Sequence, residues 1–167
     1  VGGARVPLQQ TKRSRLLFTF AAGDLGVARP FAERLRAADD ALAVDLSLTS
    51  EPFATQRADY IRASLEVRIR RALATVCLFG PDTFADDWVL WLLETTHDHG
   101  RAIVAAPIVA PSPQAVDLFS ALRATIVPLR AESFVRHVAA IEEGRVRPAA
   151  VGESAALVLR AMRHPVR

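Results

Sequence analysis

The sequence predicts an α/β fold in which five parallel strands form one sheet with helices on both faces. Short, continuously apolar runs alternate with longer amphipathic stretches along most of the 167 residues. Continuous apolar runs are typical of parallel strands, because both of their faces are buried. Five strand–helix units in a chain of this length favour a flavodoxin-like, doubly wound sheet with the strand order 2-1-3-4-5.

The first half of the chain shows both periodicities clearly. Val27, Phe31 and Leu35 are spaced four apart and therefore form one apolar helix face. Ile61 and Leu65 begin a similar row, and charged side chains occupy another face of that stretch. The predicted elements are strand 16–20, helix 27–38, strand 42–46, loop 49–55 and helix 59–73.

The second half repeats the alternation, and its elements have clear boundary signals. Gly80 and Pro81 end the apolar run before them, and Asp86 or Asp87 can cap the helix that follows. Gly100 is suited to the left-handed position that ends this helix. The predicted elements are strand 75–79, a helix from 86 or 87 to 99, strand 102–108, helix 112–124, strand 125–128, helix 132–143 and helix 153–163.

The length suits one domain with a core that needs neither disulfides nor metals. We expect an N-terminal extension or linker at 1–13, the domain at 14–144, and a linker followed by a helix at 145–167. Since the sequence does not begin with Met, it leaves open whether the chain is one domain of a longer protein.

Composition excludes several classes of protein. A chain that is 51% hydrophobic and 23% charged is not intrinsically disordered. No apolar run approaches the roughly 18 residues of a membrane span, and the N-terminus lacks the apolar region of a secretory signal. The single cysteine, Cys77, excludes a disulfide framework and lies mid-strand as an inert core residue. A cytoplasmic protein is therefore expected.

The positive charge does not favour nucleic-acid binding. Of the 21 basic residues, 20 are arginines, which are scattered along the sequence and give a net charge of +3. Scattered charge usually marks solvated faces, so we interpret the arginines as background composition. No metal is expected either, because His97 and His99 are two apart on a helix and point to different sides.

Several catalytic motifs are absent from the sequence. There is no GxxxxGK[ST], GxGxxG, GxSxG or HExxH pattern, which argues against ATP hydrolysis, Rossmann redox chemistry, the hydrolase fold and zinc proteolysis. In a doubly wound sheet, ligands bind at the carboxyl ends of the strands near the point where the strand order reverses. Residues 21–24, 45–53 and 80–87 should meet there.

Residues 79–94, FGPDTFADDWVLWLLE, are the most specific stretch. A strand ending in glycine, a polar loop with threonine and W-V-x-W opening a helix resemble prokaryotic TIR-like domains, especially the Thoeris-type branch linked to NAD signalling. LLFTFAAGD and LAVDLSLTSEPF are similar to that branch's first strand and to its second strand with the loop that follows. The similarity spans about residues 14–110, and the order and spacing of its motifs carry it.

The resemblance implies cleavage of the nicotinamide–ribose bond of NAD, sometimes with cyclisation to a nucleotide signal. The family's W-x-x-x-E glutamate, which steadies the ribose, is replaced here by Leu92, four residues after Trp88. Glu94 is the nearest carboxylate, but two residues along a helix turn the side chain by about 200°. The resemblance assigns the nucleotide pocket to Phe20, Asp24, Asp45, Ser47, Thr83 and Trp88.

Three hypotheses about function remain open. The first is a TIR-like signalling domain of an antiphage system that has lost catalysis and acts by TIR–TIR or partner assembly. The second is an active NAD glycohydrolase or cyclase that uses Glu94, with Asp45 or Asp24 as alternatives; the third is a sensor of NAD or a cyclic ADP-ribose-type nucleotide. The assembly surface would comprise Pro52, Phe53, Trp88 and Trp91, although both tryptophans suit a core equally well.

Overall fold

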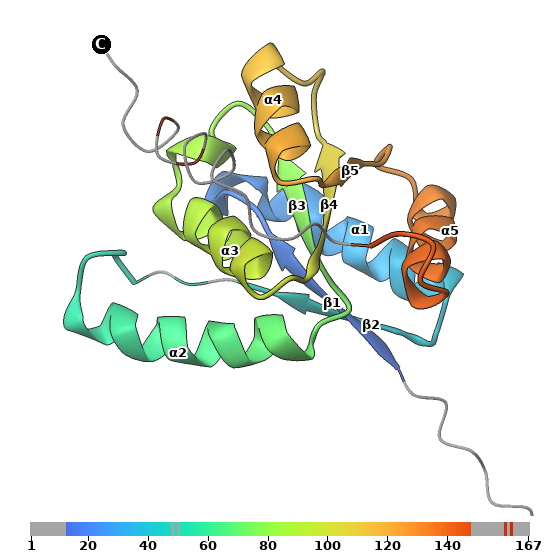
Figure 1. The fold of residues 1–167 in the computed structure, drawn as a ribbon, viewed down its shortest axis with the longest axis horizontal. Coiled ribbons are helices and arrows are strands. Elements are labelled where there is room, and N and C mark those ends of the chain that lie inside the picture. The colour runs from blue at the N-terminus through green and yellow to red at the C-terminus, as the bar shows by residue number, and fades with distance from the viewer. Residues whose placement is uncertain (1–12, 48, 50, 148–158, 160, 162–167) are drawn as a thin grey trace, which may run out of the picture.

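Five parallel strands form the centre of the computed structural model, which describes residues 13–47, 49, 51–147, 159 and 161 (Figure 1). The strands are β1 (Ser14–Thr19), β2 (Leu42–Leu46), β3 (Ala74–Phe79), β4 (Ala102–Pro107) and β5 (Thr125–Ile126). Their order in the sheet is β2-β1-β3-β4-β5, and every pairing is parallel. The predicted fold class and strand order are therefore confirmed.

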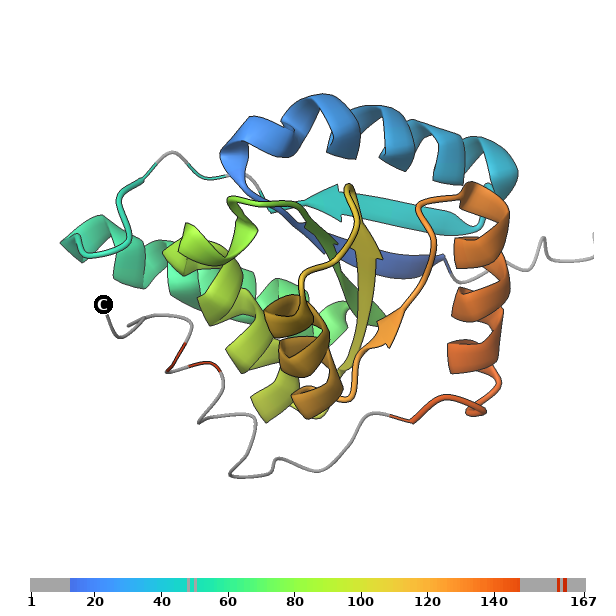
Figure 2. The same ribbon diagram turned by 90° about the horizontal axis from the view of Figure 1, so that it is seen from above.

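Helices cover both faces of the sheet (Figure 2). One face carries α1 (Leu25–Ala38) and α5 (Ala131–Glu142). The other carries α2 (Gln56–Arg71), α3 (Asp87–Asp98) and α4 (Pro113–Ala121). Two single turns of 3-10 helix, η1 (Ala22–Asp24) and η2 (Thr83–Ala85), follow β1 and β3.

The side chains of the central strands alternate between two cores. Leu16 and Phe18 of β1 face α1 and α5, whereas Leu17 faces α2 and α3. On the first face, the Phe31 ring lies 6.1 Å from that of Phe18 and 5.1 Å from that of Phe134. This alternation follows from the period of two in a strand, and it explains why these strands are apolar throughout.

Several element boundaries differ from the prediction for local reasons. Helix α2 begins at Gln56 rather than at residue 59, because the Thr55 hydroxyl caps it by accepting a hydrogen bond from the Ala58 N–H. Helix α4 ends at Ala121, and Arg123 just after it has a positive φ of 50°. The helix predicted at 153–163 lies mostly outside the described residues; Leu159 and Ala161, which are described, are helical.

Leu159 is 3% exposed and belongs to the core cluster that contains Phe79 and Phe119. The C-terminal segment therefore contributes a side chain to the core between the sheet, α3 and α4. Among the described residues, none of the helices combines the length and the apolar character needed to cross a membrane.

We expect Leu159→Ala to lower the free energy of unfolding by about 2–3 kcal/mol, because it removes a buried side chain and leaves a cavity. Urea denaturation followed by circular dichroism measures the change. Ala161→Ser is the matched control, since Ala161 is exposed on the same helical segment and its replacement should change stability by less than about 0.5 kcal/mol. An unchanged denaturation midpoint for Leu159→Ala would contradict its place in the core.

Candidate functional site

An open pocket of about 370 Å³ lies where the carboxyl ends of the central strands meet. The loops after β1, β2 and β3 form it, together with the start of α3, as the strand order predicts. Its lining residues are Ala21, Glu51, Pro52, Phe53, Asp82, Ala85, Asp86, Asp87 and Trp88.

Four carboxylates line this pocket, and no lysine or arginine does. Asp86 is the N-cap of α3, accepting hydrogen bonds from the N–H groups of Trp88 at 2.9 Å and Val89 at 3.4 Å. Glu51 accepts one from the Thr55 hydroxyl at 2.7 Å. The side chains of Asp82 and Asp87 are exposed and have no hydrogen bond or ion pair within the described part of the chain. The pocket thus has unbalanced negative charge.

Asp24 adds a carboxylate just behind the pocket. Its Oδ2 atom lies 3.7 Å from the position that a Cβ atom on Gly80 would occupy. Burial raises the pKa of the Asp24 carboxyl, and the negative charge of Asp82 raises it further.

Trp88 holds the loop after β2 against α3. Its indole N–H donates a 2.8 Å hydrogen bond to the carbonyl oxygen of Glu51. Its ring meets that of Phe53 edge to face at 5.0 Å, and Trp91 packs almost perpendicular to it at 6.1 Å. With 9% exposure, Trp88 is a core residue whose edge reaches the pocket.

Arg62 of α2 completes this contact and was not foreseen from the sequence. Its guanidinium lies over the Phe53 ring at 4.7 Å and the Trp88 ring at 5.8 Å. It also donates to the Phe53 carbonyl oxygen at 2.9 Å and to Asp59 at 2.7 Å. Only Asp59, three residues earlier on the same helix, gives a sequence signal for this role.

Of the six residues predicted for a nucleotide pocket, Trp88 alone is among the lining residues. Asp45 forms a two-pronged ion pair with Arg68, which ties β2 to α2. Thr83 is fully buried, and its hydroxyl accepts a 2.8 Å hydrogen bond from the Gly80 N–H. Phe20 lies in the core beside α1, and the buried Ser47 hydroxyl has no partner within the described residues.

Leu92 lies one turn after Trp88 on the same face of α3. It is 1% exposed and packs in the cluster that contains Leu17 and Ile69. Glu94 is partly buried and does not line the pocket. The position that the TIR pattern gives to a catalytic glutamate is therefore filled by an apolar core residue.

The predicted assembly surface divides between core and exterior. Pro52 is exposed, and Phe53 and Trp91 are half-buried, whereas Trp88 is buried. The apolar character all around α3 has a packing explanation. One side of the helix faces α2 through Trp88 and Leu92, and the opposite side faces β4 and α4 through Leu93.

The remaining reactive side chains lie away from the pocket. Cys77 is fully buried, and burial raises the pKa of its thiol, so the nucleophilic thiolate is disfavoured. His99 Nε2 lies 3.0 Å from Glu66 and links α3 to α2. Within the described residues, no three His, Cys, Asp or Glu side chains form a group able to hold a metal ion.

Fold and site together define a flavodoxin-like α/β domain with an acidic, partly aromatic pocket at the point where the strand order reverses. Comparison of the chain with models of known protein families gives no match, and comparison with curated proteins gives no significant match.

Proposed function

We propose that this chain is a TIR-like signalling domain of a prokaryotic defence system, one that does not cleave NAD and acts by assembling with copies of itself or with a partner. The burial of Leu92 is the observation that carries this proposal. A carboxylate that stabilises an oxocarbenium-like centre has to touch the ribose. Leu92 touches other apolar side chains instead, beneath Trp88.

The electrostatics of the pocket also support assembly over nucleotide sensing. NAD and cyclic ADP-ribose carry a diphosphate, whose negative charges need arginine, lysine or N–H donors. The pocket lining offers four carboxylates, and the guanidinium of nearby Arg62 is already bonded to Phe53 and Asp59. A nucleotide in this pocket would meet like charge.

The same carboxylates favour one second candidate, an active NAD glycohydrolase or cyclase. The cationic nicotinamide ring suits a pocket lined by carboxylates and two aromatic rings. In this candidate Glu94→Gln would abolish turnover without unfolding the chain. The position of Glu94 outside the lining weighs against that role.

We expect no release of nicotinamide when the purified 167-residue chain is incubated with NAD at high protein concentration. The reason is that no carboxylate replaces the missing glutamate on the face of Trp88. Chromatographic detection of nicotinamide and ADP-ribose products measures the outcome. Turnover that disappears in Glu94→Gln, while the circular dichroism spectrum stays unchanged, would overturn the proposal and establish the second candidate.

A further inference from the structure

Four exposed arginines form a row along the edge of the sheet opposite the pocket. One is the second residue of β1, and the other three lie one to three residues before the starts of β3, β4 and β5, which follow β1 in the sheet. Neighbouring strands in a sheet are about 4.8 Å apart, so the row follows the edge. The arginine row comprises Arg15, Arg71, Arg101 and Arg123.

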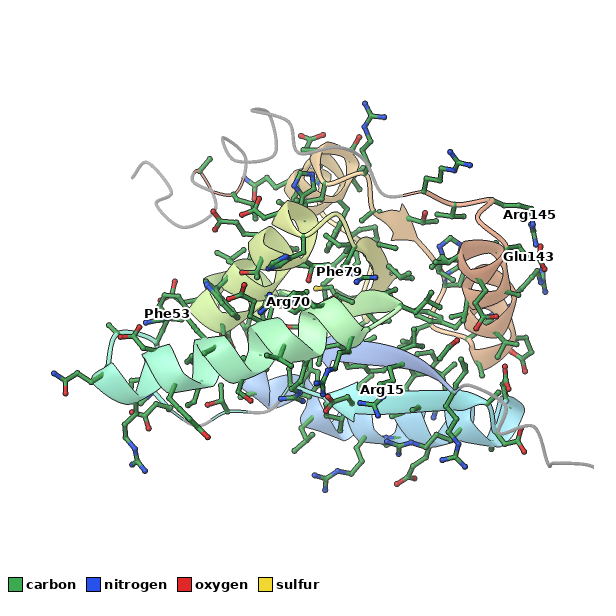
Figure 3. The ribbon with its side chains drawn as sticks, turned by 60° about the horizontal axis from the view of Figure 1, so that its bottom comes forward. Arg15, Phe53, Arg70, Phe79, Glu143 and Arg145 are labelled. Carbon is green, nitrogen blue, oxygen red and sulfur yellow. The ribbon has the colours of Figure 1, made fainter. Side chains whose placement is uncertain are left out.

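The arginine row carries positive charge that no acidic side chain among the described residues neutralises. None of its four side chains makes an ion pair or hydrogen bond within the part of the chain that the structure describes. Figure 3 shows Arg15 near the end of α2, while Phe53 of the pocket lies beside the start of that helix. Unpaired cations and unpaired carboxylates therefore lie at opposite edges of the sheet, and β3 has both, with Arg71 before it and Asp82 after it.

Acids at the arginine edge do not cancel the row. Asp39 and Asp40 lie beside β2, the strand that has no member of the row. Glu142 ends α5 and accepts a hydrogen bond from the Ser14 hydroxyl. Glu143 follows α5 and pairs with Arg145. Only Asp98, at the end of α3, is an exposed carboxylate close to Arg101 in the sequence.

Helix dipoles explain only part of this separation of charge. Acids at helix starts and cations at helix ends are a common pattern, which accounts for Asp87 and Arg71. It also accounts for Asp82, the N-cap of η2, and for Arg101, which follows the end of α3 and whose N–H bonds the Thr96 carbonyl oxygen. Arg15, in contrast, belongs to strand β1. For Arg15 the dipole gives no explanation.

We propose that the acidic pocket binds the arginine row of a second copy of this chain, so that copies associate head to tail. This inference rests on the proposed assembly function and names its surfaces. Guanidinium groups pair with carboxylates through two parallel hydrogen bonds, and Asp82 and Asp87 are free to accept them. Pro52 and Phe53, beside these carboxylates, supply apolar contact for the arginine stems.

The geometry makes this contact heterologous. The two surfaces lie at opposite ends of parallel strands, so a copy bound through its arginine row still presents a free pocket. Contacts of this kind generate open chains, or rings where the rotation closes. Association should therefore continue beyond a dimer, and it should weaken as salt screens the charges.

Sedimentation velocity of the whole chain tests the proposal between about 1 µM and 1 mM, where weak contacts become populated. We expect species larger than a dimer that grow with concentration. Raising the salt from about 0.05 M to 0.5 M should return them to monomer, because the screening length falls severalfold. If the chain stays monomeric throughout, both this inference and self-assembly as the proposed function are wrong.

Two neutralised variants test the surfaces. The pocket variant is Asp82→Asn with Asp87→Asn, and the row variant is Arg71→Gln with Arg101→Gln. Each should weaken self-association roughly tenfold or more, since each removes charge from one side of the contact. Asp117→Asn on α4 and Arg136→Gln on α5 are matched controls that should associate like the original chain, because both residues are exposed and belong neither to the pocket lining nor to the arginine row.

Mixing the two variants gives the decisive result. The intact row of the pocket variant can bind the intact pocket of the row variant, but no further copy can join. We therefore expect one-to-one heterodimers and no larger species. If both variants self-associate as the original chain does, these surfaces are wrong while self-assembly stands. Thermal unfolding of each variant verifies that a loss of association is not a loss of fold.

Discussion

Leu92→Glu is expected to lower the free energy of unfolding by more than about 4 kcal/mol, and it should not create an active NAD glycohydrolase. Leu92 is 1% exposed and lies in a cluster with Leu17, Ile69 and Trp88. The substitution removes apolar contacts from this cluster and places a carboxylate among buried apolar side chains. Introducing the glutamate of the TIR pattern at this position should therefore destabilise the core and not provide a catalytic carboxylate.

The pH dependence of this variant separates the charge from the loss of packing. Burial raises the pKa of an introduced carboxyl above its value in the unfolded chain. The folded state then binds the proton more tightly, so Leu92→Glu should be less destabilised at pH 5 than at pH 7. Urea denaturation at both pH values, relative to the original chain, measures this difference.

Two other substitutions at the same position bracket the result. Leu92→Ala should cost about 3 kcal/mol, because it leaves a cavity without adding charge. Leu92→Met nearly preserves the volume and should cost less than about 1.5 kcal/mol. If Leu92→Glu kept the original stability, its carboxylate would have to reach the pocket, and the NAD-cleaving hypothesis would regain support.

The fold was predictable because its signals are local. The strand at Leu42–Leu46 has the bounds that its apolar run predicts. Asp86 caps α3 as expected, and Gly100 has the left-handed φ of 61° that its place after a helix suggests. Alternation of such local units leaves few sheet topologies open, since parallel connections are right-handed and short.

The site was less predictable because its contacts join distant residues. The sequence indicates that polar side chains lie at the strand ends. It does not indicate whether these side chains face a ligand or make hydrogen bonds and ion pairs that stabilise the surrounding loops. Asp45 pairs with Arg68, 23 residues away, and Trp88 bonds the carbonyl oxygen of Glu51, 37 residues away. Neither distance corresponds to a helix or strand period, so no periodicity indicates these partners.

The arginine row was likewise not predictable from the sequence. Along the sequence they are scattered, which led to their interpretation as background composition. The fold gathers Arg15, Arg71, Arg101 and Arg123 because each lies at or just before a strand of one parallel sheet. In a doubly wound fold, residues that begin successive strands share an edge however far apart they are in sequence.

Trp88→Ala is the second change expected to have a large effect, lowering the free energy of unfolding by about 3–5 kcal/mol. It removes the ring that packs against Phe53 and Trp91, and it leaves the carbonyl oxygen of Glu51 without its donor. Arg62 also loses one of the two rings beneath its guanidinium. Chemical denaturation measures the loss.

The same substitution should release the loop that forms one wall of the pocket. Glu51 and Phe53 are held by Trp88 and by Arg62, so losing the indole leaves the arginine as the main tether. Cleavage after Glu51 by a glutamate-specific protease should therefore accelerate under conditions in which the variant remains folded.

Trp88→Phe separates the two contributions of the indole. It keeps an aromatic ring against Phe53 but has no N–H. The free energy of unfolding should therefore fall by about 1 kcal/mol for the lost hydrogen bond and by only part of the packing loss. If the hydrogen bond alone held the loop, Trp88→Phe and Trp88→Ala would be cleaved equally fast. Slower cleavage of Trp88→Phe would mean that ring packing holds the pocket wall. Head-to-tail association should then be weaker in Trp88→Ala than in Trp88→Phe, because Glu51, Pro52 and Phe53 line the pocket only while that wall stays in place.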